Sequence, residues 1–170
     1  RVDSLIPSGT KITGHVNGDL IVDAWAGVAD AATGRKVGGE TLFGVFSCGK
    51  GVLATAIHIL ADRGKLEYDI PETRYWPEFA ANGKDRITVR NVMSHMAGIP
   101  ALPEGSTVED LLDWDRMCGR IAELTPIWEP GTRTGYHART YGYVLGEVVR
   151  RVDGRRINRF IREEISQPLG

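Results

Sequence analysis

The chain has 170 residues, of which 42% are apolar and 25% are charged, and its formal net charge is −1. This length predicts one domain that can bury a core. The near balance of 21 basic and 22 acidic residues argues against a nucleic-acid-binding protein, which would carry a basic excess. No apolar run is long enough to span a bilayer, and two cysteines are too few for a disulfide-rich scaffold.

The compartment is not fixed by the sequence. The chain begins at Arg1 without a Met or a signal segment, so it is compatible with a processed form or a fragment. The two cysteines, Cys48 and Cys118, favour a reducing cytoplasm only slightly.

The first third of the chain is typical of β-strands. Residues 10–16 and 19–28 are rich in strand-forming residues, and Asn17-Gly18 between them is a favoured hairpin turn because both positions need positive φ. A polar, glycine-rich stretch from residue 30 to 40 follows. Residues 41–46 then form a short apolar segment, which we expect to be a further strand.

At Ser47 the apolar spacing changes from that of a strand to that of a helix. Residues 47–63 predict a largely buried helix that ends at Gly64 and has one apolar face, made of Val52, Leu53, Ala56, Ile57 and Leu60.

More helices are predicted after this one. Thr88 is expected to cap a helix that reaches Met96, and Ser106 with Glu109 forms a capping box. A helix over 137–152 closes at Gly154, and a last helix stops before Pro168 with four residues directed inward, Ile157, Phe160, Ile161 and Ile165. Strands followed by helices indicate an α+β fold instead of alternating βαβ units.

Ser47 and Lys50 are candidates for nucleophilic catalysis. A serine hydroxyl needs a nearby base, and residues three apart at a helix start share a face, so the Lys50 amine can reach Ser47 Oγ. The lysine must be neutral part of the time to act in this way. The helix start also offers free backbone amides and a positive dipole end, which suit a developing oxyanion. The same spacing is common on helices without any catalytic role.

Tyr136 is the third candidate, placed between a glycine-containing loop and a predicted helix. Beside a lysine, its phenol could relay a proton to the serine or to a leaving group. A tyrosine in such a place is more commonly a core residue with a satisfied hydroxyl.

Four segments together resemble the serine β-lactamase and penicillin-binding superfamily, in its branch of class C β-lactamase-like (family VIII) esterases. Ser47-Cys48-Gly49-Lys50 matches the Ser-x-x-Lys motif, and residues 88–100 resemble the family's T-x-x-x-L-L-x-H-x-S-G-L-P segment. Residues 128–132 resemble its F-x-P-G turn, and Tyr136-His137-Ala138 occupies its Tyr-x-Asn position. The four matches occur in the family's order between residues 10 and 170.

The resemblance implies a β-lactamase/transpeptidase-like fold and an acyl-enzyme mechanism. Ser47 would be the nucleophile, Lys50 and Tyr136 its proton-transferring pair, and the Ser47 backbone N–H one half of the oxyanion hole. His137 and Ala138 would border a substrate cleft, and His95 would have a structural role in its loop. The resemblance requires no metal or organic cofactor, and the implied substrate is a small ester or a β-lactam-like molecule.

Two departures from the family pattern shift these expectations. Ala138 replaces the Asn whose amide would contact a β-lactam or peptide, which favours ester hydrolysis over β-lactamase or D,D-peptidase activity. Those two activities and that of an acyltransferase of the same superfamily remain the alternatives. No Lys-Thr-Gly or His-x-Gly strand motif follows Tyr136. We therefore expect residues 1–170 to be the N-terminal portion of one catalytic domain, with strands over 1–46 and helices over 47–170. A C-terminal remainder or a second chain would complete the sheet.

Alternative functions remain open from the residues alone. Gly49-Lys50-Gly51-Val52-Leu53-Ala54 fits G-x-G-x-x-A, a dinucleotide-binding pattern, but no second apolar strand follows between residues 64 and 76. The Gly-x-Ser-x-Gly elbow of Ser-His-Asp hydrolases is not met at Ser47 because residue 45 is Val. The four histidines show no zinc-site spacing. A non-catalytic binding module with this fold is the alternative from another class.

Overall fold

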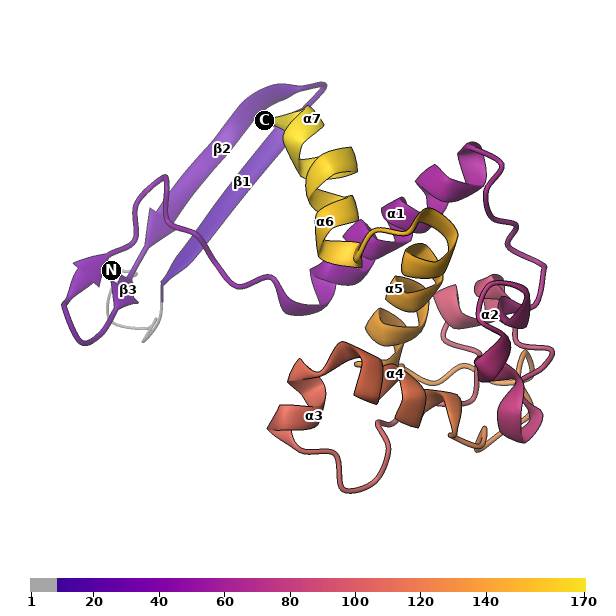
Figure 1. Ribbon diagram of the computed structural model, residues 1–170. Helices are drawn as coiled ribbons and strands as arrows, with labels where there is room; N and C mark the ends of the chain where they lie inside the picture. The colour runs from indigo at the N-terminus through magenta and orange to yellow at the C-terminus, as the bar shows by residue number, and fades with distance from the viewer. Residues whose placement is uncertain (1–8) are drawn as a thin grey trace. The chain divides into compact units, whose positions relative to one another are not determined.

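The computed structural model describes residues 9–170, which belong to two compact units. The first unit ends at Val45 and holds strands β1–β4, and the second runs from Phe46 to Gly170 and holds helices α1–α7 (Figure 1). Strands first and helices after is the order expected of the α+β class.

In the first unit, β1 (Thr10–Val16) and β2 (Asp19–Ala26) form the predicted antiparallel hairpin. Its turn residues Asn17 and Gly18 have φ of 52° and 91°, as this kind of turn requires. The second strand ends two residues earlier than predicted because Gly27 has φ of 88°, and the chain then enters β3 (Val28–Asp30). This strand pairs with β4 (Arg35–Lys36) in a separate two-stranded sheet.

The hairpin of β1 and β2 exposes large apolar side chains. Those at least 40% exposed are Ile12, Val16, Leu20, Ile21, Val22 and Trp25. The hairpin pairs with no third strand among residues 9–170, so both of its strands are edges in the part of the chain that the structure describes.

The predicted strand over residues 41–46 is wrong. Residues 41–45 adopt no regular structure, and Phe46–Cys48 forms a 3₁₀ turn. The Phe46 backbone has φ of 40°, outside the strand region, and its side chain is 95% exposed. An apolar run becomes a strand only when it finds a partner, and this one pairs with no other segment that the structure describes.

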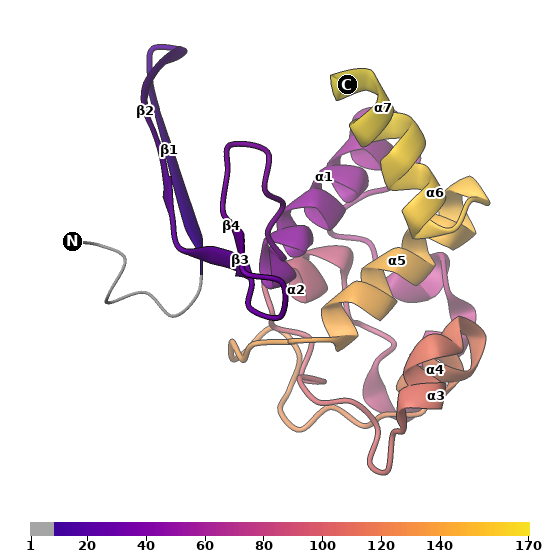
Figure 2. The same cartoon turned by 90° about the vertical axis from the view of Figure 1, so that its left-hand side faces the viewer.

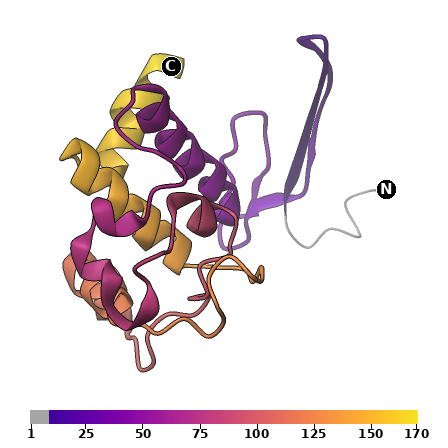
Figure 3. The same cartoon turned by 90° about the vertical axis from the view of Figure 1, so that its right-hand side faces the viewer.

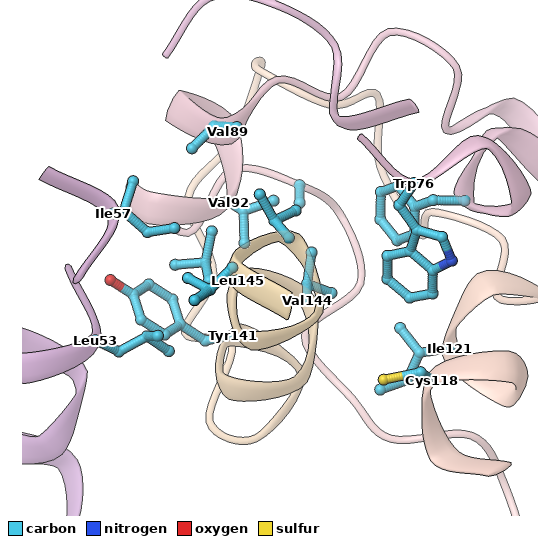
Figure 4. Close-up of a cluster of buried hydrophobic side chains, with 14 of the residues drawn as sticks. Leu53, Ile57, Trp76, Val89, Val92, Cys118, Ile121, Tyr141, Val144 and Leu145 are labelled. Carbon is cyan, nitrogen blue, oxygen red and sulfur yellow. The ribbon is translucent and has the colours of Figure 1, made fainter. Parts of the chain in front are cut away.

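The second unit is built around α1 (Gly49–Asp62) and α5 (Thr140–Asp153), which lie side by side (Figure 2). Four of the five residues predicted for the apolar face of α1 are buried, namely Leu53, Ala56, Ile57 and Leu60, whereas Val52 is exposed. Gly64 ends this helix with φ of 66°, and its N–H donates to Ala61 O. Figure 4 shows Leu53 and Ile57 packed toward Tyr141 and Leu145 of α5.

Short helices cover the other side of α5. Two 3₁₀ segments (Glu72–Arg74 and Pro77–Gly83) lead to α2 (Val89–Met93), and α3 (Val108–Leu112) is followed by α4 (Trp114–Ala122). In Figure 4 the side chains of Cys118 and Ile121 on α4 lie beside Trp76, which is buried as expected of a core residue.

Capping side chains set where α2 and α3 begin. Thr88 caps α2 as predicted, in a reciprocal box with Asn91. The second predicted box is displaced by one residue, because Thr107 caps α3 and pairs with Asp110. The Ser106 hydroxyl instead donates to Pro103 O.

The last helical stretch is longer than predicted. It consists of α6 (Ile157–Ile161), a π turn (Arg162–Ser166) and α7 (Gln167–Leu169). Pro168 lies in α7, inside this continuous helical stretch, so the helix does not stop before it as predicted. At the other end of α6, Gly154 closes α5 in the left-handed conformation, as predicted.

Two glutamates are fully buried in the second unit. Glu147 accepts hydrogen bonds from Trp114 Nε1 at 2.8 Å, from Arg150 at 2.7 Å and from Arg151 at 2.8 Å. Burial alone would raise its pKa, but these donors outweigh burial and lower it. Neither carboxyl oxygen of Glu72 has a hydrogen-bond partner among residues 9–170, and burial raises its pKa well above the usual value.

No helix in the described part of the chain combines the length and apolarity needed to cross a bilayer.

Candidate active site

Ser47 and Lys50 meet at the start of α1. Ser47 lies in the 3₁₀ turn that precedes the helix, and Lys50 lies in the first helical turn, so three residues of separation place them on one face. Lys50 Nζ donates to Ser47 Oγ at 3.3 Å and to the Ala138 carbonyl oxygen at 2.8 Å. The amine is thus held between α1 and the segment that leads into α5.

Tyr136 joins this pair from a distant part of the sequence. Its hydroxyl oxygen is 2.6 Å from Ser47 Oγ, and the centre of its ring is 4.8 Å from Lys50 Nζ. The pKa of the Tyr136 phenol is lower than is usual for tyrosine. The main cause is its hydrogen bond with Ser47, and the neighbouring Lys50 is a smaller cause. The structure therefore brings together the three residues predicted to carry the chemistry.

The start of α1 is open to an anionic group. The side chain of the N-cap residue, Cys48, accepts no hydrogen bond from the backbone N–H groups of the first helical turn. That turn also carries no acidic residue. The leading N–H groups of a helix have no partner within the helix, and they carry the positive end of its dipole. Negative charge that develops next to Ser47 is stabilised at this position.

His95 accepts hydrogen bonds from the residues on both sides of Tyr136. Its carbonyl oxygen accepts from the Gly135 N–H at 3.0 Å, and its ring Nδ1 accepts from the His137 N–H at 3.1 Å. The His95 ring also lies 5.0 Å from the Tyr136 ring, centre to centre. Its φ of 61° is uncommon for a residue other than glycine, and such strained residues concentrate at functional sites. From the sequence, His95 is predicted to have only a structural role in its loop.

The segment that follows α2 holds the rest of the Tyr136 loop. Met96 O accepts from Gly131 N, Gly98 O accepts from Ile127 N, and Thr140 Oγ1 donates to Ile99 O. Figure 3 shows the orange loop that leads into α5 running beside this segment. Since most of these bonds join backbone atoms, the residue types of the sequence do not predict them.

Gly135 permits a close approach immediately before Tyr136. A Cβ atom at this position would lie 2.5 Å from the Trp128 ring, too close for any side chain. The indole of Trp128 therefore packs directly against the Gly135 backbone, and the loop keeps its path only with glycine there.

His137 does not border a cleft, which corrects the prediction. Its side chain is 1% exposed, its Nδ1–H donates to Gly135 O at 2.6 Å, and its Nε2 accepts from the Ile99 N–H at 3.1 Å. Burial is the main cause of its lowered pKa, so the ring is neutral and serves to hold the loop. Ala138 is exposed and contributes its carbonyl oxygen, which binds Lys50.

The dinucleotide-binding hypothesis has no structural basis in the described residues. Gly49 and Gly51 lie inside α1, and the segment before Ser47 is not a strand. Residues 64–76 form loops and a 3₁₀ turn, so the βαβ unit that such a site requires does not occur there.

Known proteins match the described part of the chain in sequence and in fold. The family model described as Beta-lactamase matches residues 9–170. The chain belongs to the Beta-lactamase family. The superfamily resemblance inferred from the four sequence segments is thereby confirmed.

The most similar relatives include esterases. The chain is 41% identical over 161 residues to the Esterase/beta-lactamase LipL of Mycobacterium tuberculosis, which is 95% of this chain and 37% of that protein. The crystal structure of a family VIII carboxylesterase matches with a TM-score of 0.87 and 40% identity, over 96% of this chain and 45% of the other. A penicillin-binding protein homologue from Caulobacter crescentus matches with a TM-score of 0.88 and 40% identity, over 96% and 44%.

These matches confirm the expected β-lactamase/transpeptidase-like fold. The chain spans less than half the length of each of these three relatives.

Proposed function

We propose that this chain carries the catalytic residues of a serine hydrolase that acts on small carboxylic esters. The observation that carries the proposal is the meeting of three side chains, with Tyr136 Oη 2.6 Å and Lys50 Nζ 3.3 Å from Ser47 Oγ. A nucleophilic serine needs a base within hydrogen-bond reach, and here two groups meet that condition. The esterase relatives support the same reaction class.

The proposed reaction has two steps. In the first, Ser47 Oγ bonds to the ester carbonyl carbon while its proton passes to the Tyr136–Lys50 pair, and the pair returns a proton to the departing alkoxide. In the second, water gives its proton to the pair and attacks the acyl carbon. The ester bond to Ser47 then breaks, and Oγ takes back the proton, so the free acid leaves and the serine is restored.

Charge that develops on the carbonyl oxygen needs hydrogen-bond donors in place before the reaction. The Ser47 backbone N–H is our candidate for one donor, because it precedes the uncapped start of α1. The positive end of the helix dipole favours negative charge at the same point.

The residue two positions after Tyr136 supports an ester over a β-lactam or peptide. Ala138 offers no side-chain amide, and only its carbonyl oxygen takes part in the site, as the acceptor for Lys50. A substrate amide would lose a specific hydrogen bond there, which an ester does not require.

We also propose that a further stretch of polypeptide, or a second chain, completes the sheet that β1 and β2 begin. The exposed apolar side chains and two open edges of this hairpin support it, because isolated two-stranded sheets are marginally stable. Full esterase activity of these 170 residues as a monodisperse monomer with cooperative unfolding would contradict this proposal.

Mass spectrometry after exposure to p-nitrophenyl acetate and a rapid acid quench tests the proposed nucleophile. We expect one acetyl group on the peptide that contains Ser47, and none in Ser47→Ala. Ser94→Ala is the matched control, since Ser94 is exposed and, within residues 9–170, its hydroxyl donates to Arg90 O and Asn91 O outside the site. Acetylation that persists in Ser47→Ala would assign the chemistry to another residue.

His95 is proposed as a positioning residue for Tyr136. Replacing it by Phe keeps a ring but removes the acceptor for the His137 N–H, and we expect kcat to fall about 10- to 100-fold with KM little changed. Replacing it by Asn restores an acceptor near the place of Nδ1 and should recover most of kcat. Steady-state kinetics with a p-nitrophenyl ester compares the two variants. If His95→Phe and His95→Asn lose kcat equally, and each loss parallels a loss of thermal stability, the role of His95 is only structural.

A further inference from the structure

Tyr141 lies in the first turn of α5, beside the Lys50 amine. Its side chain is only 4% exposed, and the centre of its ring lies 5.9 Å from Lys50 Nζ. The centre of the Tyr136 ring lies 4.8 Å from the same nitrogen. Two aromatic rings, one from the loop before α5 and one from α5 itself, therefore lie next to the amine.

The groups around the Lys50 amine attract it from several directions. An ammonium group within about 6 Å of an aromatic ring centre is drawn to the face of the ring. The Ala138 carbonyl oxygen accepts a hydrogen bond from Lys50 Nζ at 2.8 Å, and Ser47 Oγ accepts one at 3.3 Å. Because a lysine side chain is long and flexible, its amine keeps one place only where such contacts hold it.

Tyr141 also packs against His95, the residue that accepts hydrogen bonds from both neighbours of Tyr136. The centre of the His95 ring lies 5.0 Å from the centre of the Tyr141 ring and 5.0 Å from that of the Tyr136 ring. Burial, and to a smaller extent the nearby Lys50, lowers the pKa of His95, so this ring adds no second positive charge at neutral pH. The Tyr141 ring thus contacts both the amine and the histidine beside it.

The two tyrosines near Lys50 differ in their protonation. Burial raises the pKa of Tyr141, whereas the pKa of Tyr136 is lowered by its hydrogen bonds with Ser47 and Lys50. The Tyr141 phenol therefore keeps its proton at a pH at which Tyr136 has begun to lose its own. Tyr141 is not a second base, and the part of it that bears on the site is its ring.

We propose that Tyr141 is a positioning residue for Lys50, whose amine its ring holds beside Ser47 Oγ and the Ala138 carbonyl. The proposal rests on the proposed hydrolase function and adds to it a residue that acts through Lys50. It assigns this role to the aromatic ring and none to the hydroxyl.

Replacing Tyr141 by Phe or by Leu separates the ring from the hydroxyl. For p-nitrophenyl acetate we expect kcat to fall about 10-fold or more in Tyr141→Leu with KM little changed, and to stay within about twofold in Tyr141→Phe. Tyr143→Leu is the matched control, because Tyr143 lies on the same helix and its ring packs on Trp114 instead, with the ring centres 5.2 Å apart. We expect this control to lose stability and to retain kcat.

Three kinetic results would overturn the proposal. They are an unchanged kcat in a Tyr141→Leu variant that is folded by circular dichroism, an equal loss in Tyr141→Phe, and an equal loss in Tyr143→Leu. The second would assign the effect to the hydroxyl, and the third would assign it to general destabilisation. Absence of activity on every ester in the unsubstituted protein would instead refute the proposed function.

An NMR measurement locates the Lys50 amine without any catalysis. Protons above the face of an aromatic ring resonate upfield, so in protein labelled with ¹³C-lysine we expect the Lys50 Hε signals, assigned with Lys50→Arg, upfield of those of Lys65. Lys65 is a suitable reference because its amine pairs with Asp153 at 3.6 Å. The upfield displacement should persist in Tyr141→Phe and shrink in Tyr141→Leu. Equal positions of the Lys50 and Lys65 signals in the unsubstituted protein, or no change in Tyr141→Leu, would contradict the proposal whatever the activity.

Discussion

Tyr136→Phe is expected to lower kcat/KM for a p-nitrophenyl ester by about 100- to 10,000-fold, the usual contribution of a positioned acid–base group. The ring and its contact with His95 are retained, so the loss reports the hydroxyl that lies 2.6 Å from Ser47 Oγ. Tyr75→Phe serves as control, because in the described part of the chain the Tyr75 hydroxyl accepts from the Glu67 N–H, outside the site. A Tyr136→Phe variant within tenfold of the wild type would show that Lys50 acts without the phenol.

The same residue sets the expected pH dependence. The base form of the Tyr136–Lys50 pair has lost one proton, so activity rises with pH as this proton leaves. Since Ser47 and Lys50 lower the pKa of Tyr136, we expect the midpoint of this rise to lie below the usual tyrosine value of about 10. A rise that tracks an unperturbed tyrosine would mean that the three groups do not interact in solution.

Glu147→Ala is expected to destabilise the second unit by about 3 kcal/mol, the lower end of the cost of breaking a buried ion pair. The change leaves the Trp114 N–H and the Arg150 and Arg151 guanidinium groups without their shared acceptor, and the side chain removed is fully buried. We choose the lower end because each arginine side chain is about one-third exposed and recovers part of its hydration.

Urea unfolding followed by tryptophan fluorescence measures this loss. Glu123→Ala is the control, since Glu123 is exposed at the end of α4, and we expect it to change stability by no more than about 0.5 kcal/mol. A loss below about 1 kcal/mol for Glu147→Ala would show that the arginines find other partners.

Local signals made the start of α1 predictable. The spacing of Ser47 and Lys50, the apolar face of the helix and the glycine that ends it all lie within one element, where chain geometry fixes which residues are neighbours. Tyr136 lies in a loop without helical or strand periodicity, so its place beside Ser47 and Lys50 was predicted from the superfamily resemblance.

Non-local contacts explain what sequence reasoning missed. Whether residues 41–46 form a strand depends on a pairing partner, and whether His137 faces outward depends on a bond to Ile99, 38 residues away. The hydrogen bonds between His95 and the two neighbours of Tyr136 could not be predicted for the same reason. One of them is made by the backbone carbonyl of His95, which any residue type would supply.

The Glu72 carboxyl links folding of the second unit to proton concentration. Burial raises its pKa, so above the ordinary glutamate range the folded chain retains a proton that the unfolded chain has released. Its contribution to stability is therefore complete in acid, below the unfolded pKa, and is lost as the pH rises through the folded value. A rise in pH that promotes deprotonation of Tyr136 thus removes stability from the unit that holds this residue, so we expect the proposed activity and the stability of the chain to respond to pH in opposite directions.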